Sequence, residues 1–295
     1  MKATVYVVSG IGLIFSLFTT AINILLVYRN IRSRNKANTD MTLFFYRFVL
    51  DALMGSALGI YLSLTVSYLI FPSSLAIIRD YVGLIGLPSS NAAAARALIV
   101  LFINVERCLA VYFPMFYHKL RRDLVLTAVL ATSVSFGFFE DVVLFVLCDF
   151  SSFIAPPGCL ALGCAFSACF HNYWIYYKNV TSSITFVFSV GLCARLLYSK
   201  YWGGTKVIRK SYRMNYLAVI DVSIVLLFNF MPSFLANIFP DSKLFSFEHV
   251  GPYSAVCKLF GSTVDAVLAY YRGTGQKGRA VRNLAEFLGR EVIFH

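Results

Sequence analysis

An acidic and a basic residue stand side by side near the end of a long apolar stretch. The motif is Asn104-Val-Glu-Arg-Cys-Leu-Ala-Val-Tyr-Phe-Pro114, in which Glu106 and Arg107 carry the charges. A charge at the centre of a membrane helix costs about 2.5–3.5 kcal/mol on insertion scales, so we expect this pair at the mouth of a helix. Either Arg107 simply extends to the lipid headgroups, or it faces a partner in the cytosol. The number and orientation of the membrane spans decide between the two.

Further polar and charged residues lie inside other apolar stretches. Arg47 and Asp51 are four residues apart, which places them on one helix face where they can neutralise each other. Asn23, Asp51 and Asp265 lie at similar depths in three different spans. We predict that these three form a polar network, with water or a cation, that rearranges on activation. Interhelical hydrogen bonding with a purely structural role is the alternative.

A second set of buried charges could line a ligand cavity. Arg96 precedes Arg107 by eleven residues, which is about 16 Å along a helix. Glu140 and Asp141 lie in the fourth span and Lys258 in the seventh. We expect Arg96 to pair with one of the two acids. If Arg96 and Lys258 instead lie free in a cavity, they favour an acidic or polar ligand.

The elements that must position these residues are membrane helices. Of the 295 residues, 59% are hydrophobic and 14% are charged, whereas a soluble domain carries about 25% charged residues. The mean hydropathy is +0.72. We predict an all-α bundle, residues 1–271, followed by a cytoplasmic tail, residues 272–295. The expected spans are residues 5–28, 41–71, 81–113, 124–148, 180–198, 216–239 and 253–271.

The basic residues set the expected orientation. Seventeen Lys and Arg residues fall in the first, third and fifth loops and the tail, against four on the opposite side. Cytoplasmic loops carry the basic excess, so we expect the N-terminus outside and the tail in the cytosol. The net charge of +12 is therefore explained by topology, and no nucleic-acid partner is expected.

The stretch Cys159–Tyr177 is apolar enough to resemble an eighth span. Accepting it would place the basic loop Ser199–Asn215 outside and break the charge asymmetry. We therefore predict a packed extracellular loop within the connection 149–179. The sequon at Asn179 lies so close to the fifth span that its glycosylation is not expected, although the pattern leaves it open.

Several cysteines gather where this loop should lie. At least one disulfide is plausible there, but the sequence does not give its connectivity, and small residues that pack a loop are the alternative. No pair has metal-ligand spacing with a histidine, so a zinc site is not expected. We also expect no cofactor. The candidates are Cys148, Cys159, Cys164, Cys169 and Cys257.

Two features suggest a switching helix and a membrane-surface tail. Pro232 should kink the sixth span, because proline removes a backbone hydrogen bond and clashes with the preceding turn. A kinked helix can swing outward at its cytosolic end. Residues 278–292 place apolar side chains on one helical face and basic ones on the rest, which predicts an amphipathic helix in the inner interface.

Two stretches resemble the nematode serpentine chemoreceptors, class BC or its near relatives, which are G-protein-coupled receptors with seven spans. They are Phe45-Tyr-Arg-Phe-Val-Leu-Asp51 and Glu106-Arg-Cys-Leu-Ala-Val-Tyr-Phe-Pro114. The resemblance covers the whole chain in architecture and implies a plasma-membrane receptor on sensory neurons and their cilia. Such a receptor detects small environmental molecules and signals through a heterotrimeric G protein.

The resemblance also assigns roles to residues. Glu106 and Arg107 stand where rhodopsin-like receptors have their acid–arginine pair, which with Pro232 implies G-protein coupling and activation. Asn23 and Asp51 match polar residues of their first two spans. The chain lacks a tryptophan before Pro232 and an asparagine–proline motif in the seventh span. No acid begins the sixth span to hold the arginine, so the mode of activation should differ from theirs.

Three other kinds of protein are alternatives. A transporter or ion channel could use the buried charges, although no inverted internal repeat is evident. An opsin would place a retinal Schiff base on Lys258, but we favour a salt bridge for this residue. An enzyme is rejected, because the four histidines all lie in predicted loops or the tail and cannot build an intramembrane metal site.

Overall fold

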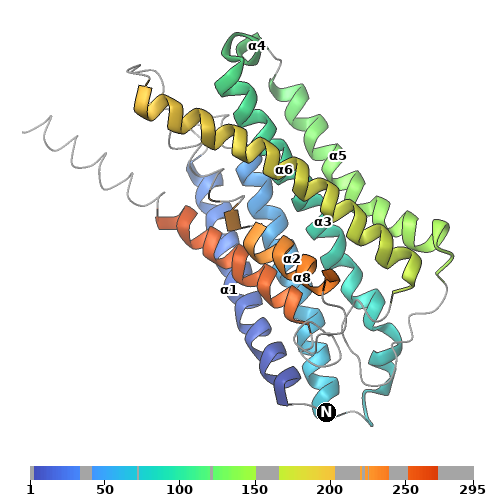
Figure 1. Ribbon diagram of the computed structural model, residues 1–295. Coiled ribbons are helices and arrows are strands. Elements are labelled where there is room, and N and C mark those ends of the chain that lie inside the picture. The colour runs from blue at the N-terminus through green and yellow to red at the C-terminus, as the bar shows by residue number, and fades with distance from the viewer. Residues whose placement is uncertain are drawn as a thin grey trace, which may run out of the picture.

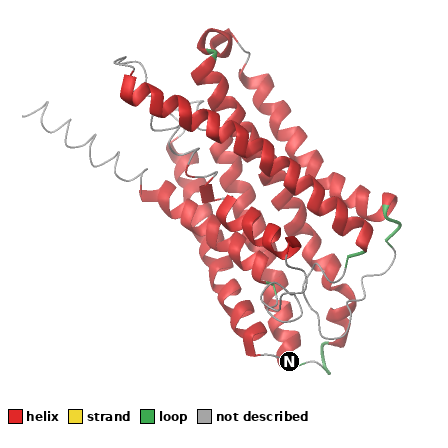
Figure 2. Ribbon diagram, viewed as in Figure 1, coloured by secondary structure: helices red, strands yellow, loops and turns green. Residues whose placement is uncertain are grey.

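The computed structural model describes residues 3–33, 42–71, 73–119, 122–150, 166–202, 220, 223–224, 226–238 and 252–271. All regular structure in these residues is helical, and no strand occurs among them (Figure 2). The elements are α1 (Ala3–Ser33), α2 (Thr42–Ile70), α3 (Ala76–Tyr112), α4 (Pro114–Lys119), α5 (Arg122–Val142), the π-helical turn η3 (Val143–Leu147), α6 (Ala168–Trp202), the π-helical turn η5 (Leu226–Phe230), α8 (Met231–Ile238) and a helix over residues 253–271.

The helices form one bundle around α3. α1 packs on α2, α2 packs on α3, and α3 also contacts α5 and α6 (Figure 1). The helix over residues 253–271 lies between α1 and η5, because Val256 faces Gly12 and the ring of Phe260 lies 5.1 Å from that of Phe228. The short α4 lies at the end of the bundle opposite the N-terminus (Figure 1).

Small residues allow the helices to approach closely. A Cβ atom placed on Gly137 of α5 would stand 2.7 Å from the carbonyl oxygen of Asn91 and 3.4 Å from Cβ of Ala95, both on α3. On the other side of the bundle, Ser16 of α1 donates to the carbonyl oxygen of Gly55 at 2.8 Å. Lipid tails are as apolar as leucine, so membrane helices associate through such close packing and hydrogen bonds rather than through the hydrophobic effect.

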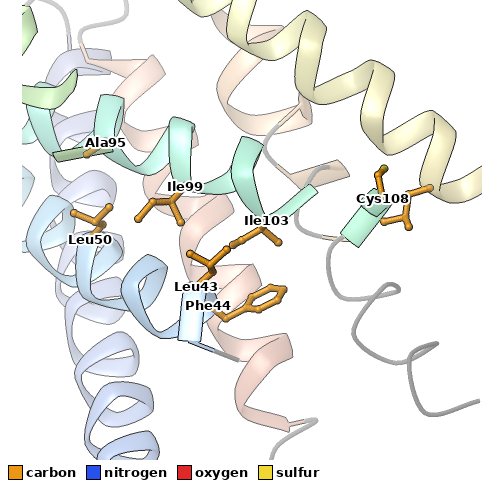
Figure 3. Close-up of a cluster of buried hydrophobic side chains, with 8 residues drawn as sticks. Leu43, Phe44, Leu50, Ala95, Ile99, Ile103 and Cys108 are labelled. Atoms are coloured by element: carbon orange, nitrogen blue, oxygen red, sulfur yellow. The ribbon is translucent and has the colours of Figure 1, made fainter. Parts of the chain in front are cut away.

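The apolar core at the α4 end of the bundle joins α2, α3 and α6. Figure 3 shows Leu43, Phe44 and Leu50 of α2 directed towards Ile99 and Ile103 of α3. Leu192 of α6 belongs to the same cluster. A second cluster, formed by Met54, Leu58, Tyr61, Leu62 and Leu259, joins α2 to the helix over residues 253–271.

Three of the described helical segments are long and apolar enough to cross a membrane by these two criteria alone: Thr4–Arg32, Thr42–Ile70 and Val125–Leu147. α3 and α6 are also long but carry more polar residues, among them Arg96 and Lys178. Such residues are tolerated in a membrane helix where they face other helices.

The helix that contains the predicted fifth span begins before it. Residues 168–177, predicted as part of an extracellular loop, are the first turns of α6. His171, Asn172 and Lys178 interrupt the apolar run, so hydropathy alone does not indicate the start of this helix. Phe170 and Tyr177 are buried and share one face of the helix, since they are seven residues apart, so packing on that face supports the helix.

Pro232 lies next to irregular helix geometry. It is the second residue of α8, and α8 directly follows η5, so the switch from π-helical to α-helical geometry falls next to the predicted site of the kink. Pro88 lies inside α3. The predicted tail helix and the residues Cys159 and Cys164 lie outside the described part of the chain.

Candidate functional site

Four charged residues from three helices meet in the middle of the bundle. Arg47 and Asp51 come from α2, Arg96 from α3 and Asp265 from the helix over residues 253–271. Their exposed fractions are 2, 1, 3 and 4%, respectively. We call these four residues the central ion cluster. Two guanidinium groups and two carboxylates make it neutral as a whole.

Each carboxylate contacts both arginines. Arg96 donates from Nε to Oδ1 of Asp51, and its Nη2 lies 3.8 Å from Oδ2 of Asp265. Arg47 contacts Oδ2 of Asp265 through Nη2, and its Nε lies 3.5 Å from Oδ2 of Asp51. Ser262 adds a hydrogen bond to Oδ1 of Asp51 at 3.2 Å. Mutual pairing of this kind offsets the cost of taking the charges out of water.

This geometry corrects two predictions. Arg96 pairs with Asp51 and Asp265 rather than with a carboxylate of the fourth span. Asn23 forms its hydrogen bond within α1 and not with the cluster, since its Nδ2 donates to the carbonyl oxygen of Thr19 at 2.8 Å. The predicted contact of Arg47 with Asp51 across one helical turn is present.

Glu140 and Asp141 instead bind polar side chains of α3. Ser90 donates to Oε2 of Glu140 at 2.8 Å, and Nδ2 of Asn91 donates to Oδ2 of Asp141 at 2.9 Å. Glu140 is fully buried. These two bonds fix α5 against α3 next to the close approach at Gly137.

Two lysines lie near Glu140, around one indole ring. Nζ of Lys178 lies 2.8 Å from the centroid of the Trp174 ring, and Nζ of Lys258 lies 5.2 Å from it. Both amines lie close enough to Glu140 to interact with its charge. Because Trp174 and Lys178 are four residues apart on α6, they share one helix face. We call this set of residues the outer polar cluster: Ser90, Asn91, Glu140, Asp141, Tyr173, Trp174, Tyr177, Lys178 and Lys258.

The predicted ligand-cavity residues therefore separate into two groups. Glu140, Asp141 and Lys258 belong to the outer polar cluster, whereas Arg96 belongs to the central ion cluster. Sequence reasoning placed Lys178 in a loop and so missed it. Its spacing from Trp174 in a helical register is the signal that could have found it.

A disulfide closes the end of the bundle beyond the outer polar cluster. Cys148 follows η3 and bonds to Cys169 in the first turn of α6. Cys257, the other described candidate, is a free thiol. Disulfides persist in oxidising compartments, so the bond supports the predicted extracellular position of this end.

Arg107 lies near the opposite end of α3 and is 3% exposed. Its Nη2 lies 3.3 Å from Oε2 of Glu106, and the hydroxyl group of Tyr117 on α4 donates to Oε1 of Glu106 at 2.8 Å. The guanidinium carbon lies 6.0 Å from the ring centroid of Phe44 on α2. The charged pair is thus held between α2, α3 and α4. Tyr117 is a member of this site that the sequence analysis missed.

No group of three or more potential metal ligands occurs among the described residues. The charged residues that the structure describes inside the bundle contact other protein groups instead. A helical bundle with long apolar helices, paired interior charges and a disulfide at one end has the architecture of a polytopic membrane protein.

The sequence model of one receptor family matches residues 1–272 of the chain. The family is described as serpentine type 7TM GPCR chemoreceptor Srbc. The chain belongs to this family, which confirms the predicted membership and the all-α, seven-helix fold. No match was found among curated individual proteins.

Membership fixes the general class of the protein. It is a multi-pass membrane protein of a chemoreceptor family and not a member of an enzyme family. A ligand and a G protein are the generic partners of such a receptor.

Proposed function

We propose that the protein binds a small environmental molecule inside the helix bundle and signals through a heterotrimeric G protein in the cytosol. In this proposal it acts in the plasma membrane of sensory neurons, at their cilia. Family membership supports the general role. The observation that carries the proposal for this chain is the buried Arg107, held by Glu106 at the α4 end of the bundle.

The position of Arg107 suits a switch for coupling. The guanidinium is buried beside the partly exposed carboxylate of Glu106, so a conformational change that separates the two groups can turn the arginine towards the cytosol. Ligand binding at the other end of α3 would bias that change through the helix itself. Glu106 and Arg107 are then the coupling residues, and Pro232 marks the segment that moves.

The mutual pairing within the central ion cluster disfavours the transporter or channel as an explanation of these charges. Carriers of ions or protons expose charged groups to a pathway, whereas Asp51 and Asp265 are each engaged by two arginines. We therefore assign the cluster to the connection between α2, α3 and the last described helix.

The test is ligand-evoked G-protein activation in cells that express the full chain, screened against small volatile and water-soluble molecules. Arg107→Ala should abolish the response while surface expression stays largely intact. Arg195→Ala is the matched control, because Arg195 is exposed and lies beside Tyr112 near the same end of α3. Signalling that persists in Arg107→Ala would contradict the role assigned to this residue.

A further inference from the structure

Polar atoms without partners gather in the outer polar cluster. Three donors on α6 are shielded from solvent and form no hydrogen bond of good geometry with the described residues: Tyr173 Oη, Trp174 Nε1 and Lys178 Nζ. The same holds for three acceptors, Asn91 Oδ1, Glu140 Oε1 and Asp141 Oδ1. The hydroxyl group of Tyr177 lies near Trp174 and Glu140, and the amine of Lys258 lies near Lys178, but these contacts leave the six atoms incompletely bonded. Buried polar groups are bonded in nearly all proteins, so such a gathering indicates that a molecule belongs between them.

The two lysines indicate that this molecule carries a negative charge. Lys178 and Lys258 lie beside each other at the ring of Trp174. Glu140 is near enough to both amines to interact with their charge, but it forms no close ion pair with either and directs one oxygen to Ser90. One carboxylate supplies a single negative charge for two neighbouring ammonium groups, so a second anion between them is favoured in a medium of low dielectric.

We propose that the outer polar cluster binds the carboxylate group of a small organic acid, with Lys178 and Lys258 as its two cationic contacts. This deepens the proposed function and rests on it, since it names the chemical class of the ligand. The carboxylate accepts hydrogen bonds from both amines. Trp174 offers its Nε1–H as a further donor.

The location suits a ligand that enters from outside. Lys178 follows Cys169 by nine residues, which places it about 14 Å along α6 from the disulfide. Glu140 precedes Cys148 by eight residues, or about 12 Å at the same rise. The cluster therefore lies inside the bundle, and Arg96 of the central ion cluster is close enough to interact with the charge of Lys258.

The test measures ligand binding without a G protein. Purified full-length receptor in detergent is heated with linear monocarboxylates of two to eight carbons and with benzoate, each compared with its primary amide. We expect at least one carboxylate to raise the melting temperature, by roughly 5 °C at a concentration about 100 times its Kd. The amides should leave it unchanged.

Variants assign the effect to the lysines. Lys178→Met removes the amine and keeps the length of the side chain, so the affinity for the carboxylate should fall at least about tenfold. Lys178→Arg keeps the charge and should retain binding, which separates loss of the contact from failure to fold. Arg195→Met, on the exposed far part of the same helix, is the matched control and should bind as the wild type does.

Two results would overturn the proposal. One is stabilisation by no carboxylate, or by amides and carboxylates alike. The other is carboxylate binding that survives in Lys178→Met. Because the readout needs no G protein, a receptor that binds carboxylates but fails to signal would contradict the proposed function alone.

Discussion

Arg96 on α3 donates from Nε to Oδ1 of Asp51 on α2, and both side chains are shielded from solvent. The same arginine reaches towards Asp265 of the last described helix. One side chain thus connects α3 to the preceding helix α2 and to the last described helix, which is distant in sequence. The contribution of these contacts should be measurable as a change in the melting temperature of the receptor when one partner is replaced.

Asp51→Asn should destabilise the receptor strongly. The variant leaves two arginines facing a single carboxylate, and removing one partner of a buried ion pair costs about 3–5 kcal/mol. The melting temperature in detergent should fall by roughly 10 °C. Asp149→Asn is the control, because Asp149 is exposed and has a positive φ of 45° that asparagine tolerates. Adding Arg96→Gln to Asp51→Asn should recover part of the loss, and a double variant that is additive would contradict the pairing.

Gly137→Ala should weaken the contact of α5 with α3. The new Cβ would stand 2.7 Å from a backbone oxygen of Asn91, which cannot rotate away, and overpacking of this kind costs about 1–3 kcal/mol. Gly191→Ala is the matched control, since no atom lies within 4 Å of the added Cβ. There the better helix propensity of alanine should leave stability equal or slightly raised. Equal melting temperatures for the two variants would disprove the close approach.

Removing the disulfide should lower stability by about 3 kcal/mol, as expected for opening a loop closed by two cysteines that are 21 residues apart. Cys148→Ser and Cys169→Ser should have the same effect, and the double variant should add nothing. Thermal unfolding with and without reductant measures this. Cys193→Ser is the control because Cys193 is a free thiol. If the double variant is less stable than either single variant, the two cysteines are not bonded to each other.

Tyr117→Phe should raise G-protein activation without ligand. The variant removes the hydrogen bond of 2.8 Å to Glu106 and so loosens the group that holds Arg107. Hydrogen bonds to charged groups contribute about 1.5–3 kcal/mol, so basal activity should rise several-fold. Tyr176→Phe is the control, because Tyr176 is 72% exposed. Basal activity equal to that of the wild type would argue against a restraining role for α4.

The helices were predictable where the apolar runs are continuous. α2 begins and ends within a few residues of the expected span. α1 begins close to the expected residue but extends further at its C-terminal end. The start of α6 is harder to predict, because hydropathy counts Lys178 as polar wherever its side chain points. A helix that buries polar side chains among other helices loses the hydropathy signal while it keeps the 3.6-residue period.

The partners of the buried charges were harder to predict. Residue spacing gives the depth of Arg96, but depth alone does not distinguish Asp51 on one side of α3 from Glu140 on the other. The direction of a side chain around the helix axis depends on which neighbour packs on each face. The contact of Arg47 with Asp51 was predictable, because both residues belong to one helix and need no neighbour to set their geometry.

The cations that balance Asp51 and Asp265 are part of the polypeptide. Arginine keeps its charge at any physiological pH, so neither acidity nor the salt content of the surrounding fluid can remove these counter-charges. With its interior charges matched from within, the bundle can keep one resting conformation when the pH or the salt content of its surroundings changes.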